Sequence, residues 1–167
     1  MIVIPPALAE RPLLHYVAQP RTVTMADLGA AIGQALGVVE GWLEERGISP
    51  VGPPLVRYRV IDMAHELDVE VGVPVAQSIE VADGLVADSL PLGTYGVATY
   101  RGAAEGVTGN AALIEWARES GVAWASTPTA DGGEAFVCRV ETLLGDPDVN
   151  PDPATWETEV AILVATA

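Results

Sequence analysis

The chain has 167 residues, half of them hydrophobic, which suits a single folded domain with a buried core and excludes intrinsic disorder. Eight basic residues against 23 acidic ones give a formal net charge of −15. This charge repels the phosphate backbone of nucleic acids and anionic membranes. We therefore expect no direct nucleic-acid binding and no membrane partner, and a preference for cationic small molecules.

The compartment is predicted from the single cysteine and the first residues. Cys138 has no partner for an internal disulfide, which is typical of a reducing compartment. Residues 1–6 lack the basic segment and the long apolar run of a signal peptide, and no apolar run has the length of a membrane span. We expect a cytoplasmic protein.

The first half of the chain predicts the order strand, helix, strand, strand. An opening strand is expected at residues 13–19. The helix is predicted to start at Thr24, whose hydroxyl can cap it, and to end at Gly47, with apolar residues spaced by three or four positions between them. Strands at 55–61 and 66–75 complete the unit.

The second half repeats this order after a linker at residues 76–91. A strand at 95–100, a helix at 108–120 and strands at 135–141 and 158–165 are expected. Three short blocks recur in the same order: 42–47 with 116–121, 52–58 with 133–139, and 67–76 with 156–165. The pattern predicts an α+β fold of one domain, 1–167, built from tandem β-α-β-β modules at about 10–77 and 92–167.

The duplication also predicts where a ligand would bind. Each module has enough helix to cover only one face of its antiparallel sheet. Placing two modules edge to edge puts the helices on one face and leaves a ligand groove on the other, at the junction of the copies.

Glu159 is the first candidate for a binding residue. Strand alternation places it opposite the β-branched residues 158, 160 and 162, beside the small Ala161, and its repeat equivalent is Glu70 beside Gly72. A carboxylate in an apolar concavity attracts a cation. The alternative is an ordinary solvent-facing strand residue.

Aromatic side chains are the second group of candidates, because aromatic faces hold flat apolar molecules and cations. Core packing is the alternative for each of them, and for Trp116 it is the favoured one. Trp156 begins the last strand and is expected at the rim. The candidates are Tyr58, Tyr100, Trp116, Phe136 and Trp156.

Neither a metal, a cofactor nor a catalytic residue is expected. The acidic residues 146–152 and Glu157 imitate a calcium loop, but Pro151 stands where such a loop requires glycine. His15 and His65 have no metal-ligand spacing, and no serine lies in a nucleophile elbow.

These segments, taken in order, resemble the GyrI-like effector-binding family, which includes ligand domains of AraC-type and multidrug-sensing transcription regulators. The matching stretches are residues 52–58, 69–75, 90–95, 100–102, 116–121 and 156–159. The resemblance implies a drug-binding cleft between the two copies, lined by aromatic residues, with a glutamate that carries over to Glu159. Family members often have a glutamate and a tyrosine in the strand corresponding to residues 136–139, where this chain has Val137 and Arg139.

The resemblance and the charge together favour a non-catalytic binder of amphipathic, cationic small molecules that sequesters drugs or acts as a sensor through a regulatory protein partner. Two alternatives stay open. One is a hydrolase of reactive DNA-alkylating natural products, which a second groove-facing glutamate, Glu70 or Glu134, would favour. The other is a protein-interaction module acting by acidic mimicry of nucleic acid.

Overall fold

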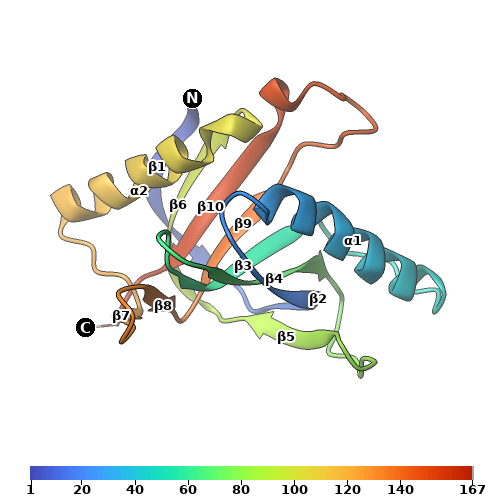
Figure 1. The fold of residues 1–167 in the computed structure, drawn as a ribbon. Helices are drawn as coiled ribbons and strands as arrows, with labels where there is room; N and C mark the ends of the chain where they lie inside the picture. Colours follow the sequence, from blue (N-terminus) through green and yellow to red (C-terminus); the bar gives the residue numbers. More distant parts are fainter. Residues whose placement is uncertain (167) are drawn as a thin grey trace.

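The computed structural model describes residues 1–166 and shows one antiparallel sheet of ten strands with two helices (Figure 1). The helices are α1 (Leu28–Glu44) and α2 (Gly106–Ser120), with short 3-10 turns η1 (Ala103–Glu105) and η2 (Pro153–Thr155). The strands are β1 (Ile2–Arg11), β2 (Leu14–Val23), β3 (Leu55–Ile61), β4 (Leu67–Pro74), β5 (Val86–Leu90), β6 (Gly93–Arg101), β7 (Ser126–Pro128), β8 (Glu134–Phe136), β9 (Arg139–Leu143) and β10 (Glu157–Leu163).

The strand order confirms the predicted duplication. The sheet runs β1-β6-β10-β9-β3-β4-β2-β5, with the β7–β8 hairpin attached to β3. One unit is β2-α1-β3-β4 and the other is β6-α2-β9-β10, and in each the closing strand lies between the other two. The two units meet where β3 pairs with β9, with Val56 opposite Glu141. This pair of strands marks the junction of the repeats.

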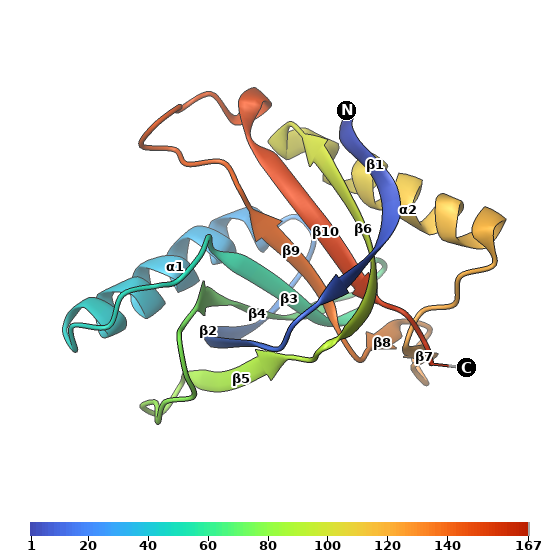
Figure 2. The same ribbon diagram turned by 180° about the vertical axis from the view of Figure 1, so that it is seen from behind.

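Two strands that the sequence pattern did not predict extend the sheet at its edges. β1 precedes the first unit but pairs with β6 of the second, and β5 precedes the second unit but pairs with β2 of the first. Figure 2 shows both edge strands in front of the sheet, viewed from the side away from the helices. Because each unit receives its outer strand from the segment before the other unit, the two halves are interlocked.

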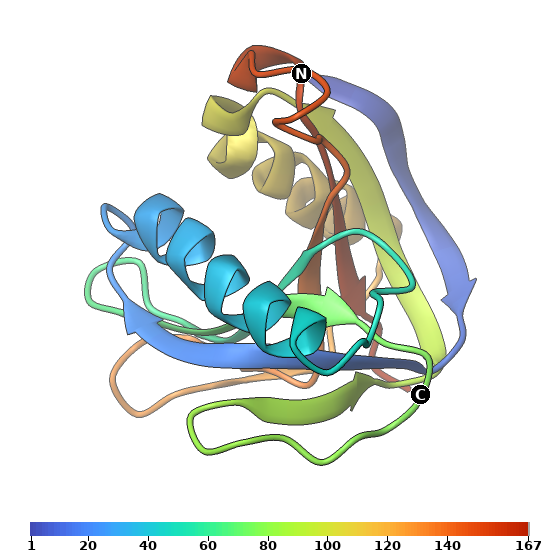
Figure 3. The same cartoon turned by 90° about the vertical axis from the view of Figure 1, so that its right-hand side faces the viewer.

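Both helices cover the same face of the sheet, as predicted (Figure 3). α1 packs on β2 and β4, whereas α2 packs mainly on β6 and the edge strand β1. The buried residues of α1 recur every four positions, at Ala31, Ala35, Val39 and Leu43. The central strands β3 and β9 lie between the two helices. Their helix-side residues at the junction are therefore covered by side chains from both units.

The opposite face is not the open groove that we expected there. Residues from β2, β3, β5, β6, β9 and β10 form a buried apolar cluster on it that includes Tyr16, Leu55, Tyr95 and Val140, together with Cys138 from the β8–β9 connection. The unpredicted strands contribute to this cluster through Leu90 of β5 and the adjoining Ala9 of β1. The extra strands make the sheet wide enough to build a second core on this side.

Several element boundaries differ from the expected ones: β2 runs to Val23 and not to residue 19, and the start of α1 and the strand expected at 135–141 differ as well. α1 begins at Leu28 and not at Thr24, because Thr24 to Asp27 form a separate turn in which the Asp27 amide donates to the Thr24 carbonyl at 3.1 Å. The strand expected at 135–141 is broken into β8 and β9. The predicted helix ends are confirmed: Gly47 and Gly121 both adopt positive φ angles, +65° and +70°, that favour glycine.

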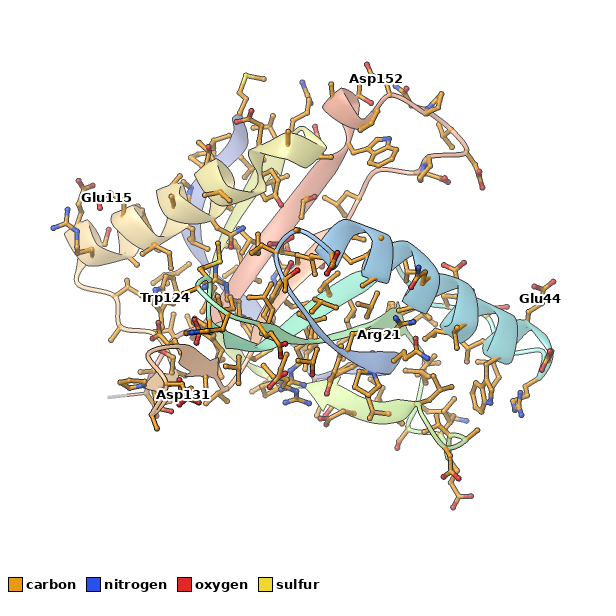
Figure 4. All side chains as sticks on the ribbon, viewed as in Figure 1. Arg21, Glu44, Glu115, Trp124, Asp131 and Asp152 are labelled. Carbon is orange, nitrogen blue, oxygen red and sulfur yellow. The ribbon has the colours of Figure 1, made fainter. Side chains whose placement is uncertain are left out.

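Acidic side chains are spread over the periphery of the molecule. Figure 4 shows Glu44, Glu115, Asp131 and Asp152 projecting outward from four separate segments. In the part of the chain that is described, neither helix has the length and apolarity needed to cross a lipid bilayer.

Candidate functional site

The junction of the repeats carries a cluster of polar side chains on the face of the helices. Glu141 of β9 lies at its centre. Its Oε1 accepts a hydrogen bond from Asn110 Nδ2 of α2 at 3.0 Å, and its Oε2 accepts one from the Tyr100 hydroxyl of β6 at 3.3 Å. Arg139, two residues earlier on β9, donates from Nη2 to Asn110 Oδ1 at 2.7 Å. Tyr58 of β3 lies close enough to Glu141 for each to influence the pKa of the other. We call Tyr58, Tyr100, Asn110, Arg139 and Glu141 the junction cluster.

Local features of α2 hold this cluster in place. Asn110 Nδ2 also donates to the Gly106 carbonyl at 2.9 Å, which fixes the amide along the first turn of the helix. The Tyr100 ring lies against Gly109, where any side chain would collide with the ring. Glycine at this position lets the Tyr100 ring pass beneath the helix, so that its hydroxyl reaches Glu141.

The ionisation of the cluster is set by burial. Removal from water raises the pKa of Glu141 above its usual value of 4.5, although hydrogen bonds from Asn110 and the charge of Arg139 act in the opposite direction. Burial and the nearby Glu141 charge also raise the pKa values of Tyr58 and Tyr100, so both phenols stay protonated at neutral pH. Glu141 itself is only partly buried by its surface area, so it has access to water. A carboxylate that is largely dehydrated yet in contact with water can attract a positive charge.

The structure brings some predicted site residues together and separates others. Tyr58 and Tyr100 are in the junction cluster, with 6% and 4% of their surface exposed. Phe136 adjoins it, because the Arg139 guanidinium lies 4.8 Å from the centre of the Phe136 ring. Trp116 packs in the apolar core beneath α2, and Trp156 is held in the β9–β10 connection, where its Nε1 donates to the Asn150 carbonyl at 2.7 Å.

Glu159 lies on the other face of the sheet from the junction cluster. Alternation along β10 is as predicted, with Val160 and Ile162 in the core on the α2 side. Glu159, on the reverse side, forms an ion pair with Arg11 of β1 at 2.9 Å. It therefore cannot share one groove with Tyr58 and Tyr100.

Glu70, the repeat equivalent of Glu159, is also on this reverse face. It accepts hydrogen bonds from the Tyr16 hydroxyl and from Arg59, at 3.1 Å from Arg59 Nε. Glu134, the other carboxylate considered for catalysis, is exposed and accepts from the Ser126 hydroxyl at 2.5 Å. Neither belongs to the set of side chains bonded to Glu141.

Sequence reasoning missed Glu141 and Asn110. The repeat alignment of residues 52–58 with 133–139 implied an offset of 81, but the sheet gives a different one. Gly72 pairs with Leu55, and its equivalent Ala161 pairs with Val140, so the offset is 140 − 55 = 85. With that register, the polar residue at the centre of the junction strand is Glu141. The available signal was the pair Arg139 and Glu141, two charged residues with period-two spacing in an otherwise apolar segment.

No protein-family model matches this chain, and a search of curated proteins finds no match. Solved structures do match. A cryo-EM structure of an EcmrR–DNA complex superposes with a TM-score of 0.76 at 16% identity, covering 100% of this chain and 59% of EcmrR. The crystal structure of the EcmrR C-terminal domain gives 0.68 at 17% identity, with 99% and 100% coverage. This chain therefore spans about three fifths of EcmrR and corresponds to its C-terminal domain.

Two further structures have the same fold. SAV2435 bound to tetraphenylphosphonium gives a TM-score of 0.63 at 12% identity, with 96% of this chain and 93% of that chain covered. A protein from Listeria innocua described as a hydrolase gives 0.58 at 13% identity, with 99% and 94% coverage. The likeness fits the GyrI-like fold implied by the resemblance, and at these identities it concerns the fold alone.

Proposed function

We propose that this protein binds amphipathic organic cations at the junction of its repeats, with Glu141 as the counter-ion and Tyr58 and Tyr100 as aromatic neighbours. The observation that carries the proposal is the partly buried Glu141 carboxylate, whose hydrogen-bonding partners are the neutral groups of Asn110 and Tyr100. A bound cation would stabilise the ionised form of this carboxylate, which burial alone disfavours. The net charge of −15 attracts such a ligand from solution.

Neighbours of the same fold support a binding role. SAV2435 is seen with tetraphenylphosphonium, a large apolar cation. EcmrR is seen with DNA, as part of a longer chain. The analogy with these folds supports a role like that of GyrI-like effector-binding domains, which sequester or sense drugs. A sensing role would act through a regulatory partner, because the acidic surface opposes contact with DNA.

We expect Glu141→Gln to weaken tetraphenylphosphonium binding at least about tenfold, which is the loss of roughly 1.4 kcal/mol or more for a single charge contact. Gln keeps the volume and one hydrogen-bond acceptor but removes the charge. Isothermal titration calorimetry with purified protein measures the change directly. A thermal shift that grows with ligand concentration in the wild type, and is reduced in the variant, is the second readout.

Glu159→Gln is the matched control, since it makes the same substitution on the other face of the sheet. Equal binding by wild type and Glu141→Gln, or a loss confined to Glu159→Gln, would refute the assignment of the site. A reactive ester or epoxide probe that has been incubated with the protein should show an unchanged mass by mass spectrometry. Turnover that depends on Glu141 would instead establish the hydrolase alternative.

Tetraphenylphosphonium binding should weaken as the pH falls. The folded pKa of Glu141 lies above 4.5, so between 4.5 and that pKa the folded carboxyl is protonated whereas the unfolded one is ionised. Acidification through this window favours the unliganded fold and removes the negative charge that the cation needs. Titrations over a pH series should give a midpoint above 4.5 in wild type and Glu159→Gln, and no such dependence in Glu141→Gln.

A further inference from the structure

Arg139 gives the junction cluster a positive charge beside its negative one. Both Arg139 and Glu141 project from the helix side of β9, and they share the Asn110 amide: Nδ2 donates to Glu141 at 3.0 Å, and Oδ1 accepts from Arg139 at 2.7 Å. Asn110 therefore lies between the two charges and separates them. The cluster presents two charged groups of opposite sign, and they are not joined in an ion pair.

The Arg139 guanidinium has unused binding capacity. Within residues 1–166, no carboxylate oxygen lies within 4.0 Å of it, in contrast to Arg57, Arg59 and Arg11 on the reverse face. Its one hydrogen bond to a side chain uses Nη2, and its planar face lies over the Phe136 ring. A guanidinium carries five N–H groups, so the remaining donors are open to an additional acceptor.

Partial burial makes this arrangement costly without a ligand. Burial lowers the pKa of Arg139, although an arginine stays charged at neutral pH. The charges of Glu141 and Glu134 oppose this shift from a distance. A ligand carboxylate could meet the open edge of the guanidinium in a bidentate contact, which is the geometry that arginine favours.

We propose that the preferred ligands of this site are zwitterionic aromatic molecules, whose cationic part pairs with Glu141 and whose carboxylate pairs with Arg139. The inference rests on the proposed function and specifies its ligand class. A cation without an acidic group pairs with Glu141 but gives the Arg139 guanidinium no acceptor. It also adds a second positive charge near that of Arg139. A zwitterion satisfies both groups and brings no net charge into a partly buried site.

Two fluorescent dyes test this directly. Rhodamine 110 carries a free carboxylate, and rhodamine 123 is its methyl ester, so the pair differs in that charge and in one methyl group. We expect wild-type protein to bind rhodamine 110 at least about tenfold more tightly than rhodamine 123, as measured by fluorescence anisotropy. Arg139→Gln should abolish the preference by weakening the binding of rhodamine 110 and not that of rhodamine 123. Arg139→Lys, which keeps the charge without the planar guanidinium, should restore part of the preference. Arg118→Gln, on an exposed side chain of α2, is the control.

The outcomes separate this inference from the proposed function. Equal or tighter binding of rhodamine 123 by wild type, with that binding still dependent on Glu141, would overturn the zwitterion class and leave the cation site intact. A preference for rhodamine 110 that survives in folded Arg139→Gln would overturn the role of Arg139. Failure of both dyes and of tetraphenylphosphonium to bind would overturn both proposals. The wild-type comparison requires no variant, so it holds even if Arg139→Gln fails to fold.

Discussion

Replacing Arg57 by Met is expected to lower the free energy of unfolding by about 3 kcal/mol, the scale seen when one member of a buried charged network is removed. Arg57 is 4% exposed and lies on the face opposite the helices. Its Nη1 donates to the Tyr16 hydroxyl and the Ser89 carbonyl, both at 3.0 Å, and Nη2 donates to the Val137 carbonyl at 2.9 Å. It therefore ties β5 of one half to the β8–β9 break of the other.

Met preserves most of the side-chain volume but leaves these acceptors without a donor. The half-exposed Asp88 would lose one of its two positive partners and keep only Arg59, which is also the partner of the buried Glu70 carboxylate. Chemical denaturation monitored by circular dichroism measures the change. The same substitution at Arg118, which is exposed and pairs with Glu115, should alter stability by no more than about 0.5 kcal/mol.

This prediction also tests the separation of the two faces. Because the network lies behind the sheet from Glu141, folded Arg57→Met protein at low temperature should bind tetraphenylphosphonium as wild type does. A change in stability below about 1 kcal/mol would show that the buried arginine is not a structural link between the halves. Loss of binding by the folded variant would show that the two faces are coupled.

Gly72→Ala is expected to destabilise the protein by about 3 kcal/mol or more, near the upper end for overpacking. In β4, a Cβ at Gly72 would stand 1.8 Å from the Val17 carbonyl oxygen and 2.6 Å from the Ala18 Cα of the neighbouring strand β2. Both are backbone atoms of a strand that is hydrogen-bonded to β4, so they cannot move aside as a flexible side chain would. The sheet would have to separate locally or change register.

Gly37→Ala is the matched control for this substitution. Gly37 lies on the exposed side of α1, and a Cβ there would meet no atom within 4 Å. Alanine should stabilise the helix by up to about 1 kcal/mol, because glycine has a low helix propensity. Thermal melts of the two variants should therefore move in opposite directions, and a neutral Gly72→Ala variant would disprove the close approach of β2 and β4.

Much of the fold was predictable, because local patterns act within one unit. The stripe of apolar residues set the buried side of α1, and Gly47 and Gly121 marked where the helices end. Alternation along β10 correctly placed Glu159 opposite Val160 and Ile162. These features depend on backbone geometry over a few residues, so no distant contact is needed to predict them.

The edge strands could not be predicted in the same way. β1 contains two adjacent prolines, and β5 has a mixed polar sequence within what reads as a linker. Each becomes a strand because the other half of the molecule offers it an unpaired edge. Such long-range pairing overrides weak local preference.

The location of the candidate site also depends partly on local sequence and partly on contacts between distant segments. The acidic charge, the repeated units and the residues that share a face of each strand follow from the order of the amino acids. Which face is closed by a second core follows from the packing of distant segments, and the same packing brings Glu141 to Asn110 and Tyr100 from 31 and 41 residues away. Alternation along a strand separates its residues into two faces, but it does not tell which of these faces other elements will cover. Which side packs and which binds depends on strands and helices far along the chain.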